Sequence, residues 1–239
     1  MKLSIIIPTL NEATYLPVTI EKIKQNAGLE EPYEIIVVDS GSTDETCDIA
    51  LKLGVKLVRS NSISSGKAYV LNEAVEFASG DVLLFLDADT LVPQGYDESI
   101  ENALSNPNVV GGAFEFSLEG PQFGLRVVEL INRIRYRIRQ RYYGDQGIFV
   151  RSHVFRIVGG YPEIGILEAA HFCKKLRKEG ELKLIKKRIY TSPRRFLDGG
   201  VYKVLGRDIK IWFLDLIGIS VDKYADAYWK ENKLRAKNQ

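Results

Sequence analysis

The first half of the chain alternates between short apolar runs and longer segments whose apolar residues recur at helical spacing. Short, β-branched apolar runs are typical of strands buried on both faces, and parallel strands need a helix-length connection between them. The alternation therefore predicts an α/β fold with a mostly parallel central sheet flanked by helices. Strands are expected at residues 3–7, 33–40, 55–60 and 81–89, and helices between them at 11–26, 43–54 and 64–80.

The pattern changes after residue 107. A strand is expected at 108–120, a basic amphipathic helix at 122–143, a helix at 166–180, a strand at 181–192 and helical structure from about residue 200. The sequence contains no low-complexity tract or linker between the halves. We therefore expect both halves to share one sheet.

Composition limits the classes of protein that fit. The chain has 239 residues, 45% of them hydrophobic, and a net charge of +2, which suits one large domain and gives no indication of nucleic-acid binding. Cys47 and Cys173 lie far apart in helix-like segments, which predicts reduced thiols and a cytoplasmic protein. Neither a signal peptide nor a membrane-spanning helix is expected, since Lys210 and Asp215 interrupt the longest apolar stretch.

Acidic residues follow two of the predicted strands. Asp39 ends the second strand, and Asp87 and Asp89 end the fourth. Ligands of parallel α/β sheets bind beyond the carboxyl ends of the strands. Two carboxylates one residue apart repel each other unless a cation lies nearby, and Mg²⁺ combines carboxylate ligands with substrate phosphates. A lone Asp-x-Asp is weak evidence, because acidic residues also end strands by chance.

Several blocks, in order, resemble a known family. The stretches "SIIIPTLNEATYLP", "EIIVVDSGSTDET" and "GKAYVLNEAVEFASGDVLLFLDADT" resemble family 2 glycosyltransferases, which have the GT-A fold with a Rossmann-like sheet. The later blocks "GDQGIFVRSHVFRIVGGYPEIGILEAAHFCKKLRKEG" and "TSPRRF" resemble the selenodomain-associated transferase 2 subgroup. The resemblance implies a GT-A domain at 1–200, with a nucleotide-binding half (1–106) and an acceptor half (107–200). A helical extension would occupy 201–239.

The resemblance implies a site for a nucleoside-diphosphate sugar. Asp39 would contact the nucleobase, while Asp89 and Asp87 would hold Mn²⁺ or Mg²⁺ and the sugar phosphate. The other donor-binding residues implied are Pro8, Thr9, Asn11, Glu12, Gly41, Ser42, Gly66 and Lys67.

Purely local structural roles could also account for several of these residues. Pro8 could end the first strand, and Asn11 or Thr14 could cap the next helix. Asp39 could stabilise a turn at the strand end, and Lys67 could be a solvated lysine.

Further residues are implied on the acceptor side. Asp145 and Gln146, between two glycines, could bind hydroxyls of the sugar or acceptor, or form a simple turn. Arg194 and Arg195 could hold a diphosphate by bidentate hydrogen bonds, or form a basic surface pair.

The chain departs from the family at the expected general base. The family's base is the Asp of a Glu-Asp pair, and here Glu168 is followed by Ala169. Glu168 or Asp145 could be the base instead, the chain could be a natural binder without catalysis, or Asp could have been deliberately changed to Ala. If position 169 is that of the missing base, Ala169→Asp should raise the transfer rate about a hundredfold or more. An unchanged rate would indicate another base, and donor binding without any transfer would favour the non-catalytic binder.

The stretch 125–143 is basic and amphipathic. Its apolar stripe predicts either a core contact with a solvated arginine face, or a helix lying on an anionic membrane. The stripe is Val127, Ile131, Ile134, Ile138 and Tyr142, and the arginines are Arg133, Arg135, Arg137, Arg139 and Arg141. The membrane alternative would place the protein at the inner membrane face and would suit a polyprenyl-phosphate acceptor.

The favoured hypothesis is an inverting, metal-dependent glycosyltransferase that uses a nucleoside-diphosphate sugar. Its acceptor would be a sugar, another small molecule or a polyprenyl phosphate. One alternative is a sugar nucleotidyltransferase, although "PTLNEATYLP" stands where that class has a Gly-rich loop. Another is a non-catalytic binder of sugar nucleotides or membranes, which Ala169 favours. The apolar, aromatic C-terminal segment could form a homodimer contact.

Overall fold

The computed structural model describes residues 1–29, 33–60 and 66–225, except for the side chains of Arg139 and Asp222. The predicted start of the helix at 64–80 and the last part of the extension, 226–239, lie outside the described residues.

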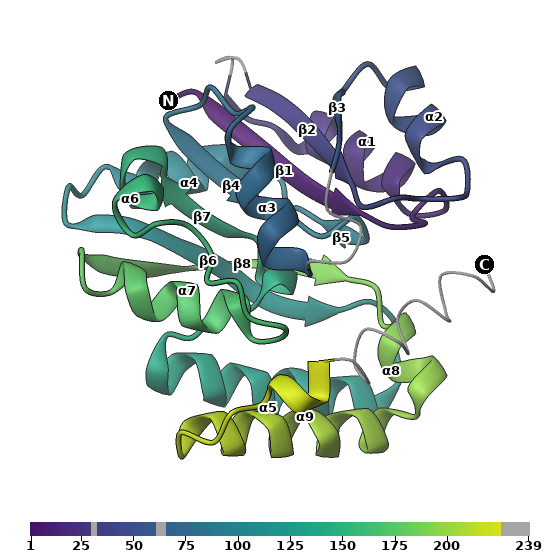
Figure 1. The fold of residues 1–239 in the computed structure, drawn as a ribbon, viewed down its shortest axis with the longest axis vertical. Helices are drawn as coiled ribbons and strands as arrows, with labels where there is room; N and C mark the ends of the chain where they lie inside the picture. The colour runs from purple at the N-terminus through teal and green to yellow at the C-terminus, as the bar shows by residue number, and fades with distance from the viewer. Residues whose placement is uncertain (30–32, 61–65, 226–239) are drawn as a thin grey trace.

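One mixed sheet runs through the described part of the chain, in the order β3-β2-β1-β4-β7-β6-β8-β5 (Figure 1). Strands β1 to β4 are parallel, β7 is antiparallel to β4 and β6, and β6 is parallel to β8. The mostly parallel α/β fold is confirmed, and strands from both halves of the chain share the sheet. The strands are β1 Leu3–Thr9, β2 Tyr33–Asp39, β3 Lys56–Arg59, β4 Val82–Phe85, β5 Thr90–Leu91, β6 Val109–Leu118, β7 Ile148–Arg151 and β8 Glu181–Thr191.

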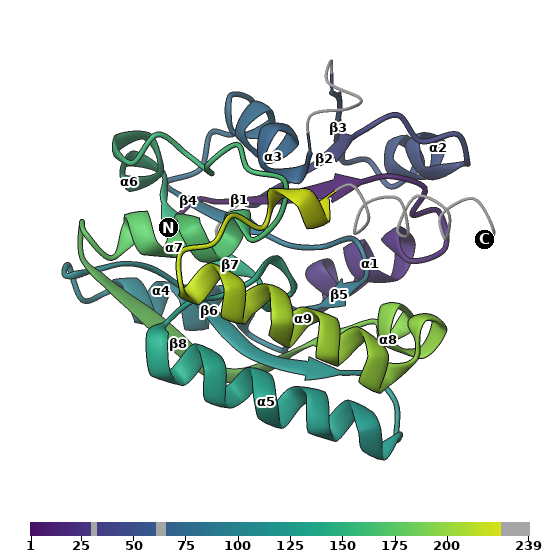
Figure 2. The ribbon, with the colours of Figure 1, turned by 60° about the horizontal axis from the view of Figure 1, so that its bottom comes forward.

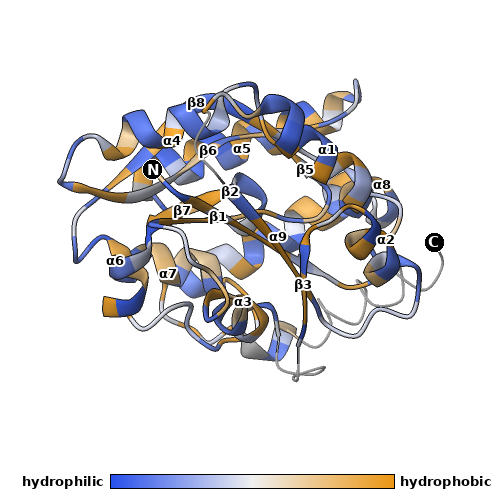
Figure 3. Cartoon of the chain, turned by 90° about the horizontal axis from the view of Figure 1, so that it is seen from above, coloured by the Kyte–Doolittle hydropathy of each residue, from blue (hydrophilic) through white to orange (hydrophobic). Residues whose placement is uncertain are grey.

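Helices cover both faces of the sheet because successive strand residues point to opposite sides. Ile5 and Ile7 pack with α1, α2 and α4, whereas Ile6 packs with α3, α6 and α7 (Figure 3). A further layer of α5, α8 and α9 lies at the end near β6 (Figures 1 and 2). The helices are α1 Leu16–Asn26, α2 Thr46–Lys52, α3 Lys67–Val75, α4 Tyr96–Leu104, α5 Phe123–Arg139, α6 Ser152–Ile157, α7 Glu168–Leu176, α8 Arg194–Gly199 and α9 Val201–Leu216, with short 3₁₀ turns η1 Gly144–Gln146 and η2 Asp222–Tyr224.

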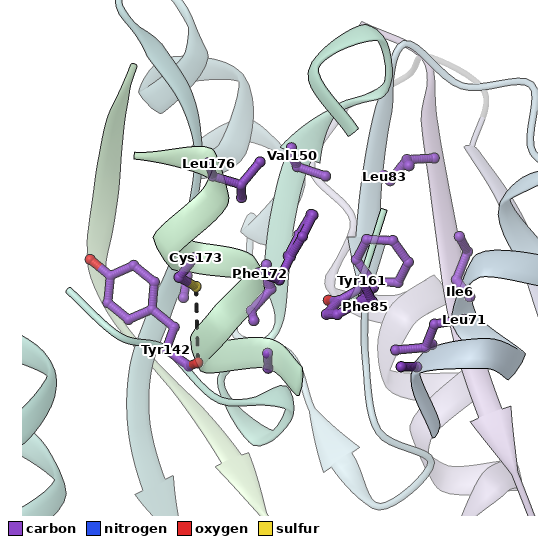
Figure 4. Close-up of a cluster of buried hydrophobic side chains, with 14 of the residues drawn as sticks. Ile6, Leu71, Leu83, Phe85, Tyr142, Val150, Tyr161, Phe172, Cys173 and Leu176 are labelled. Carbon is purple, nitrogen blue, oxygen red and sulfur yellow. Dashed lines mark hydrogen bonds between the residues drawn. The ribbon is translucent and has the colours of Figure 1, made fainter. Parts of the chain in front are cut away.

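An aromatic cluster holds α7 against the sheet (Figure 4). Phe85 meets the edge of Tyr161 with ring centroids 5.0 Å apart, and Tyr161 lies 4.2 Å from Phe172. The Cys173 thiol is reduced and donates to the backbone oxygen of Tyr142 at 3.9 Å. Because these rings are large and nearly fully buried, they fix where α7 begins, and therefore where Glu168 lies.

Local expectations at the first loop were wrong. Strand β1 continues past Pro8 to Thr9. Proline is tolerated there because the pairing of β1 with β4 ends at Ile6, so the N–H that Pro8 lacks is not needed for a bond to β4. Helix α1 begins at Leu16 rather than residue 11, and neither Asn11 nor Thr14 caps it. In addition, α5 ends before Tyr142, so that residue lies outside the predicted helical stripe.

None of the described helices is both long enough and apolar enough to cross a membrane.

We expect Gly112→Ala to destabilise the fold. A Cβ on Gly112 would lie 1.9 Å from the backbone oxygen of Lys183 and 2.6 Å from the Phe149 ring, so β6 and β8 would have to separate. Overpacking of this kind costs about 1–3 kcal/mol, which urea unfolding can measure. Gly206→Ala in α9 is the matched control, since nothing lies within 4 Å and the helix should gain about 1 kcal/mol. Equal stability of the two variants would contradict the prediction.

Candidate active site

The loops after β1 and β2 are joined by hydrogen bonds into one rigid unit. The backbone N–H of Asn11 donates to Ser42 Oγ at 2.8 Å, and Asn11 Oδ1 accepts from the backbone N–H of Thr43 at 2.8 Å. Glu12 N–H donates to Thr46 Oγ1, also at 2.8 Å. Asn11 has φ +56°, a left-handed conformation that asparagine tolerates better than most residues. These bonds hold Glu12 at the sheet edge.

Asp39 lies at this edge, but its carboxylate is engaged by its own loop. Oδ2 accepts from the backbone N–H groups of Gly41 and Ser42 at 3.0 and 2.9 Å. Oδ1 accepts from the hydroxyls of Thr9, at 3.1 Å, and Ser42. The side chain is buried, and its acceptor positions are largely used. A nucleobase could therefore bind Asp39 only if a hydroxyl turned away.

The carboxylates after β4 are paired with cations from distant parts of the chain. Asp87 forms an ion pair with Lys67 at the start of α3. Asp89 Oδ2 accepts from Arg194 Nε at 3.0 Å, and Arg194 Nη2 donates to Glu12 Oε1 at 2.6 Å. The Arg194 guanidinium also lies 4.4 Å from the centre of the Tyr15 ring. The first loop, the β4 carboxylates and α8 thus meet at one place.

The charges of this cluster fit a divalent cation bound together with a diphosphate. Glu12 Oε2 is buried without a hydrogen-bond partner, and burial raises the pKa of Glu12 to about 7, with Asp89 and Asp87 adding to the increase. Burial also raises the pKa of Asp89, and Arg194 opposes the shift. Within the described residues no group of three or more His, Cys, Asp or Glu side chains forms a complete metal site. The protein could therefore supply part of a coordination shell, which substrate phosphates would complete.

Two further carboxylates face the same region. Burial raises the pKa of Asp145 to about 6, although Arg135 opposes the shift. Burial likewise raises the pKa of Glu168, and the positive charge of Lys67 opposes this shift most strongly. Gly144 brings η1 against the cluster, since a Cβ there would lie 2.7 Å from Lys67 Nζ and 3.5 Å from Asp87 Oδ1. Raised pKa values beside a charged cluster suit general bases.

Other predicted site residues have structural partners. Gln146 is buried; its Nε2 donates to the Phe114 oxygen at 3.2 Å, and its Oε1 accepts from Tyr143 N–H. Arg195 is paired with Asp208 of α9, with contacts of 2.5 and 3.2 Å. These partners account for Gln146 and Arg195 without a ligand.

Position 169 faces the core. Ala169 is 2% exposed and packs in the apolar cluster that contains Phe172. An aspartate there would have to bury a charge among aromatic rings. Gly66, by contrast, lies at the N-terminus of α3 with φ +83°, and within the described residues no atom lies within 4 Å of where its Cβ would be.

The sequence did not indicate three of the residues at this site. Tyr15 stacks with Arg194, Tyr143 stacks with Arg135, and Asp208 holds Arg195. They come from the first loop, the segment before η1 and α9. No local pattern connects segments so far apart, so only the fold could bring them together.

The architecture defines the class of protein. Glucosyl-3-phosphoglycerate synthase from Mycobacterium tuberculosis, a GT-A protein solved with Mn²⁺, UDP and glucosyl-3-phosphoglycerate, superposes with a TM-score of 0.63. It is 20% identical, and the match covers 92% of this chain and 81% of that one. The chain also matches the model of glycosyl transferase family 2 over residues 4–159. It belongs to that family.

Two curated relatives differ in how much they share. The PGL/p-HBAD biosynthesis glycosyltransferase of M. tuberculosis is 44% identical over 91 residues, which are 36% of this chain and 34% of that protein. Glycosyltransferase AglE of Haloferax volcanii is 28% identical over 230 residues, 90% of this chain and 76% of that protein. The first match thus spans about a third of the relative's length.

Proposed function

We propose that this protein transfers a sugar from a nucleoside-diphosphate sugar to an acceptor, with inversion at the anomeric carbon. The observation that carries the proposal is the meeting of Glu12, Asp87 and Asp89 with Lys67 and Arg194 at the carboxyl edge of β1 and β4. Carboxylates and cations together can bind a metal ion and a diphosphate. Membership of the family and the Mn²⁺ and UDP in the M. tuberculosis structure support this assignment.

The nucleoside-diphosphate sugar would lie across the two rigid loops that follow β1 and β2. Asp39 and Ser42 would face the nucleobase, with a hydroxyl turning to free the carboxylate. Asp89, assisted by Asp87, would hold Mn²⁺ or Mg²⁺, which would supply Lewis-acid stabilisation of the diphosphate leaving group. Lys67 and Arg194 would then share their charge between these carboxylates and the diphosphate.

Glu168 is the proposed general base. An acceptor oxygen attacks the anomeric carbon and forms the new C–O bond while the bond to the diphosphate oxygen breaks and its electron pair leaves with the diphosphate. The acceptor proton goes to the Glu168 carboxylate. The buried start of α7 sets the position of this group, and its raised pKa makes it a better proton acceptor. Asp145 would hold the acceptor from the opposite side.

The assignment to the selenodomain-associated subgroup and the division at residues 106 and 200 are predictions that rest on sequence blocks alone. A sugar nucleotidyltransferase is disfavoured by the first loop, which has no Gly-rich segment. A non-catalytic binder would share the donor site but would have no use for Glu168.

The surface of α5 and α9 supports contact with anionic lipid. These helices lie side by side (Figure 2), and we define their α5–α9 face by the exposed apolar side chains. The exposed charged residues on the two helices, among the described side chains, are Arg137, Lys203 and Lys210, all of them basic. A basic apolar face favours an anionic membrane over a second copy of itself. The apolar members of the face are Phe123, Leu130, Ile134, Ile138, Tyr202, Ile209 and Phe213.

Three arginines of this stretch, including the exposed Arg137, are held by ion pairs and are less available to a membrane than the sequence predicted. Arg133 and Arg137 both pair with Glu115, at 3.2 and 2.7 Å. Arg141 pairs with Asp215 at 2.6 Å, and the side chain of Arg139 lies outside the described ones. The apolar residues therefore carry this proposal more than the arginines do.

Asp89→Asn should abolish stabilisation by Mn²⁺ and a nucleotide sugar. In a thermal-shift panel of nucleoside diphosphates and their sugars, with and without Mn²⁺, the wild type should gain several degrees with one base type, because binding to the native state raises Tm. Asp81→Asn, at the opposite end of β4, is the control and should keep the full shift. No shift in the wild type with any member of the panel would overturn the proposed function.

Glu168→Gln should lower kcat by about 10²–10⁴-fold while donor protection in the thermal-shift assay is unchanged, because only proton transfer is removed. Ala169→Asp should lower stability and leave the rate no higher, contrary to the expectation from sequence, because position 169 is in the core. Retention of the rate by Glu168→Gln would contradict the assignment and indicate an acceptor that is already ionised.

The double variant Ile134→Asp, Ile138→Asp should weaken sedimentation with phosphatidylglycerol vesicles by about tenfold or more, since each buried isoleucine contributes about 1.5–3 kcal/mol. Ile157→Asp, equally exposed but in α6, should bind as the wild type does. Binding should also fall with salt and be absent with phosphatidylcholine. If the double variant binds vesicles as well as the wild type does, the α5–α9 face is not the membrane contact. If the wild type forms concentration-dependent dimers and binds no lipid, the face is instead a contact with a second copy of the chain.

A further inference from the structure

Arg135 differs from its neighbouring arginines in α5. Arg133 and Arg137 share Glu115, and Arg126 pairs with Glu129 at 2.9 Å. Arg135 has no carboxylate of the described chain within ion-pair distance, and this distinguishes it from the others. Its Nε is buried without a hydrogen-bond partner, as are those of Arg126 and Arg133. Its guanidinium lies flat against Tyr143, 3.6 Å from the ring centre. Arg135 therefore points inward and does not belong to the solvated arginine face predicted from sequence.

The surroundings of Arg135 make it an anion site. Burial lowers the pKa of Arg135, while Tyr143, Asp145 and Asp208 oppose the shift, so the group stays charged. A planar guanidinium stacked on an aromatic ring keeps its in-plane N–H donors aimed outward, in the arrangement that binds phosphate with two hydrogen bonds. Because buried donors are normally paired, the unpartnered Nε of Arg135 is consistent with an anionic ligand at this guanidinium.

The position of Arg135 connects it to the proposed reaction centre. Tyr143, on which it stacks, is followed directly by Gly144, which lies against Lys67 and Asp87. The charges of Arg135, Asp87 and Arg195 all affect the pKa of Asp145. An acceptor held by Arg135 would thus extend past Asp145 toward the anomeric carbon.

We infer that Arg135, stacked on Tyr143, binds a phosphate group of the acceptor. The inference rests on the proposed function and narrows its acceptor to a phosphate-bearing molecule. A phosphate monoester carries a charge of about −1.5 to −2 at pH 7, which suits a half-buried guanidinium. Nothing in the site distinguishes a soluble phosphate ester from a lipid phosphate, so the shared phosphate is what Arg135 recognises.

The test measures binding of two phosphate probes, glycerol phosphate and farnesyl phosphate below its micellar concentration, by titration calorimetry on the full chain. Mn²⁺ and the nucleoside diphosphate that gives the largest thermal shift are present in excess, so that the donor site is filled. Arg135→Gln should weaken binding of at least one probe tenfold or more. Arg135→Lys should recover only part of it, because an ammonium lacks the planar pair of parallel N–H donors that a guanidinium offers to phosphate. Tighter binding of farnesyl phosphate than of glycerol phosphate would identify the acceptor as a lipid phosphate. Equal affinity for the two probes would identify it as a soluble phosphate ester.

Arg133→Gln is the matched control, since Glu115 keeps Arg137 as its partner, and it should bind both probes as the wild type does. Circular dichroism and the thermal shift with the nucleotide check that Arg135→Gln is folded and binds donor. If folded Arg135→Gln binds both probes with wild-type affinity, or if the wild type binds neither, the inference is wrong. Those outcomes would leave the donor-site proposal intact, because donor protection is measured separately.

Discussion

The double ion pair of Arg194 with Glu12 and Asp89 is the contact on which the site depends. It joins the first loop, the end of β4 and the start of α8, which are distant in sequence. Without cations, the carboxylates collected at this edge would repel one another in a partly buried place. Removing one partner of a fully buried ion pair costs about 3–5 kcal/mol. These side chains are 15–25% exposed, so solvent screening should make the cost smaller here. The same carboxylates and arginine that stabilise the fold by their ion pairs would thus have to bind the metal ion and the diphosphate.

The loops after β1 and β2, where we propose that the nucleotide binds, are built differently from η1 and the start of α7, where we propose that the acceptor binds. Asn11, Ser42, Thr43 and Asp39 satisfy one another through short local hydrogen bonds, which gives a rigid surface for a nucleotide. On the acceptor side, the side chains of Asp145 and Glu168 are held near charges by their helices and turns, with raised pKa values. Rigid polar loops suit recognition, and poised carboxylates suit proton transfer.

The arginines in α5 and just after it have several different structural roles. Arg133 and Arg137 satisfy a buried Glu115 on β6, so they stabilise the contact between helix and sheet. Arg141 and His171 both contact Asp215 and tie α9 to α7. Among the described arginine side chains of α5, only Arg135 stacks on a tyrosine beside the site. The surface left to α5 and α9 is therefore apolar with few cations, rather than uniformly basic.

The sequence by itself determined the sheet and the edge where the site lies. Alternating apolar strands and helices imply parallel pairing, and the carboxyl ends of parallel strands place Asp39, Asp87 and Asp89 together. Only the tertiary structure decided what these residues face. The pairing of Arg194 with Glu12 and the core position of Ala169 depend on contacts between segments far apart in the chain. The bonds from Gly41 and Ser42 to Asp39 and the stacking of Arg135 on Tyr143 are closer in sequence, but they too depend on a backbone geometry that periodicity does not report. Periodicity reports which face of an element is apolar, but it carries no information about which distant side chain will meet a charge.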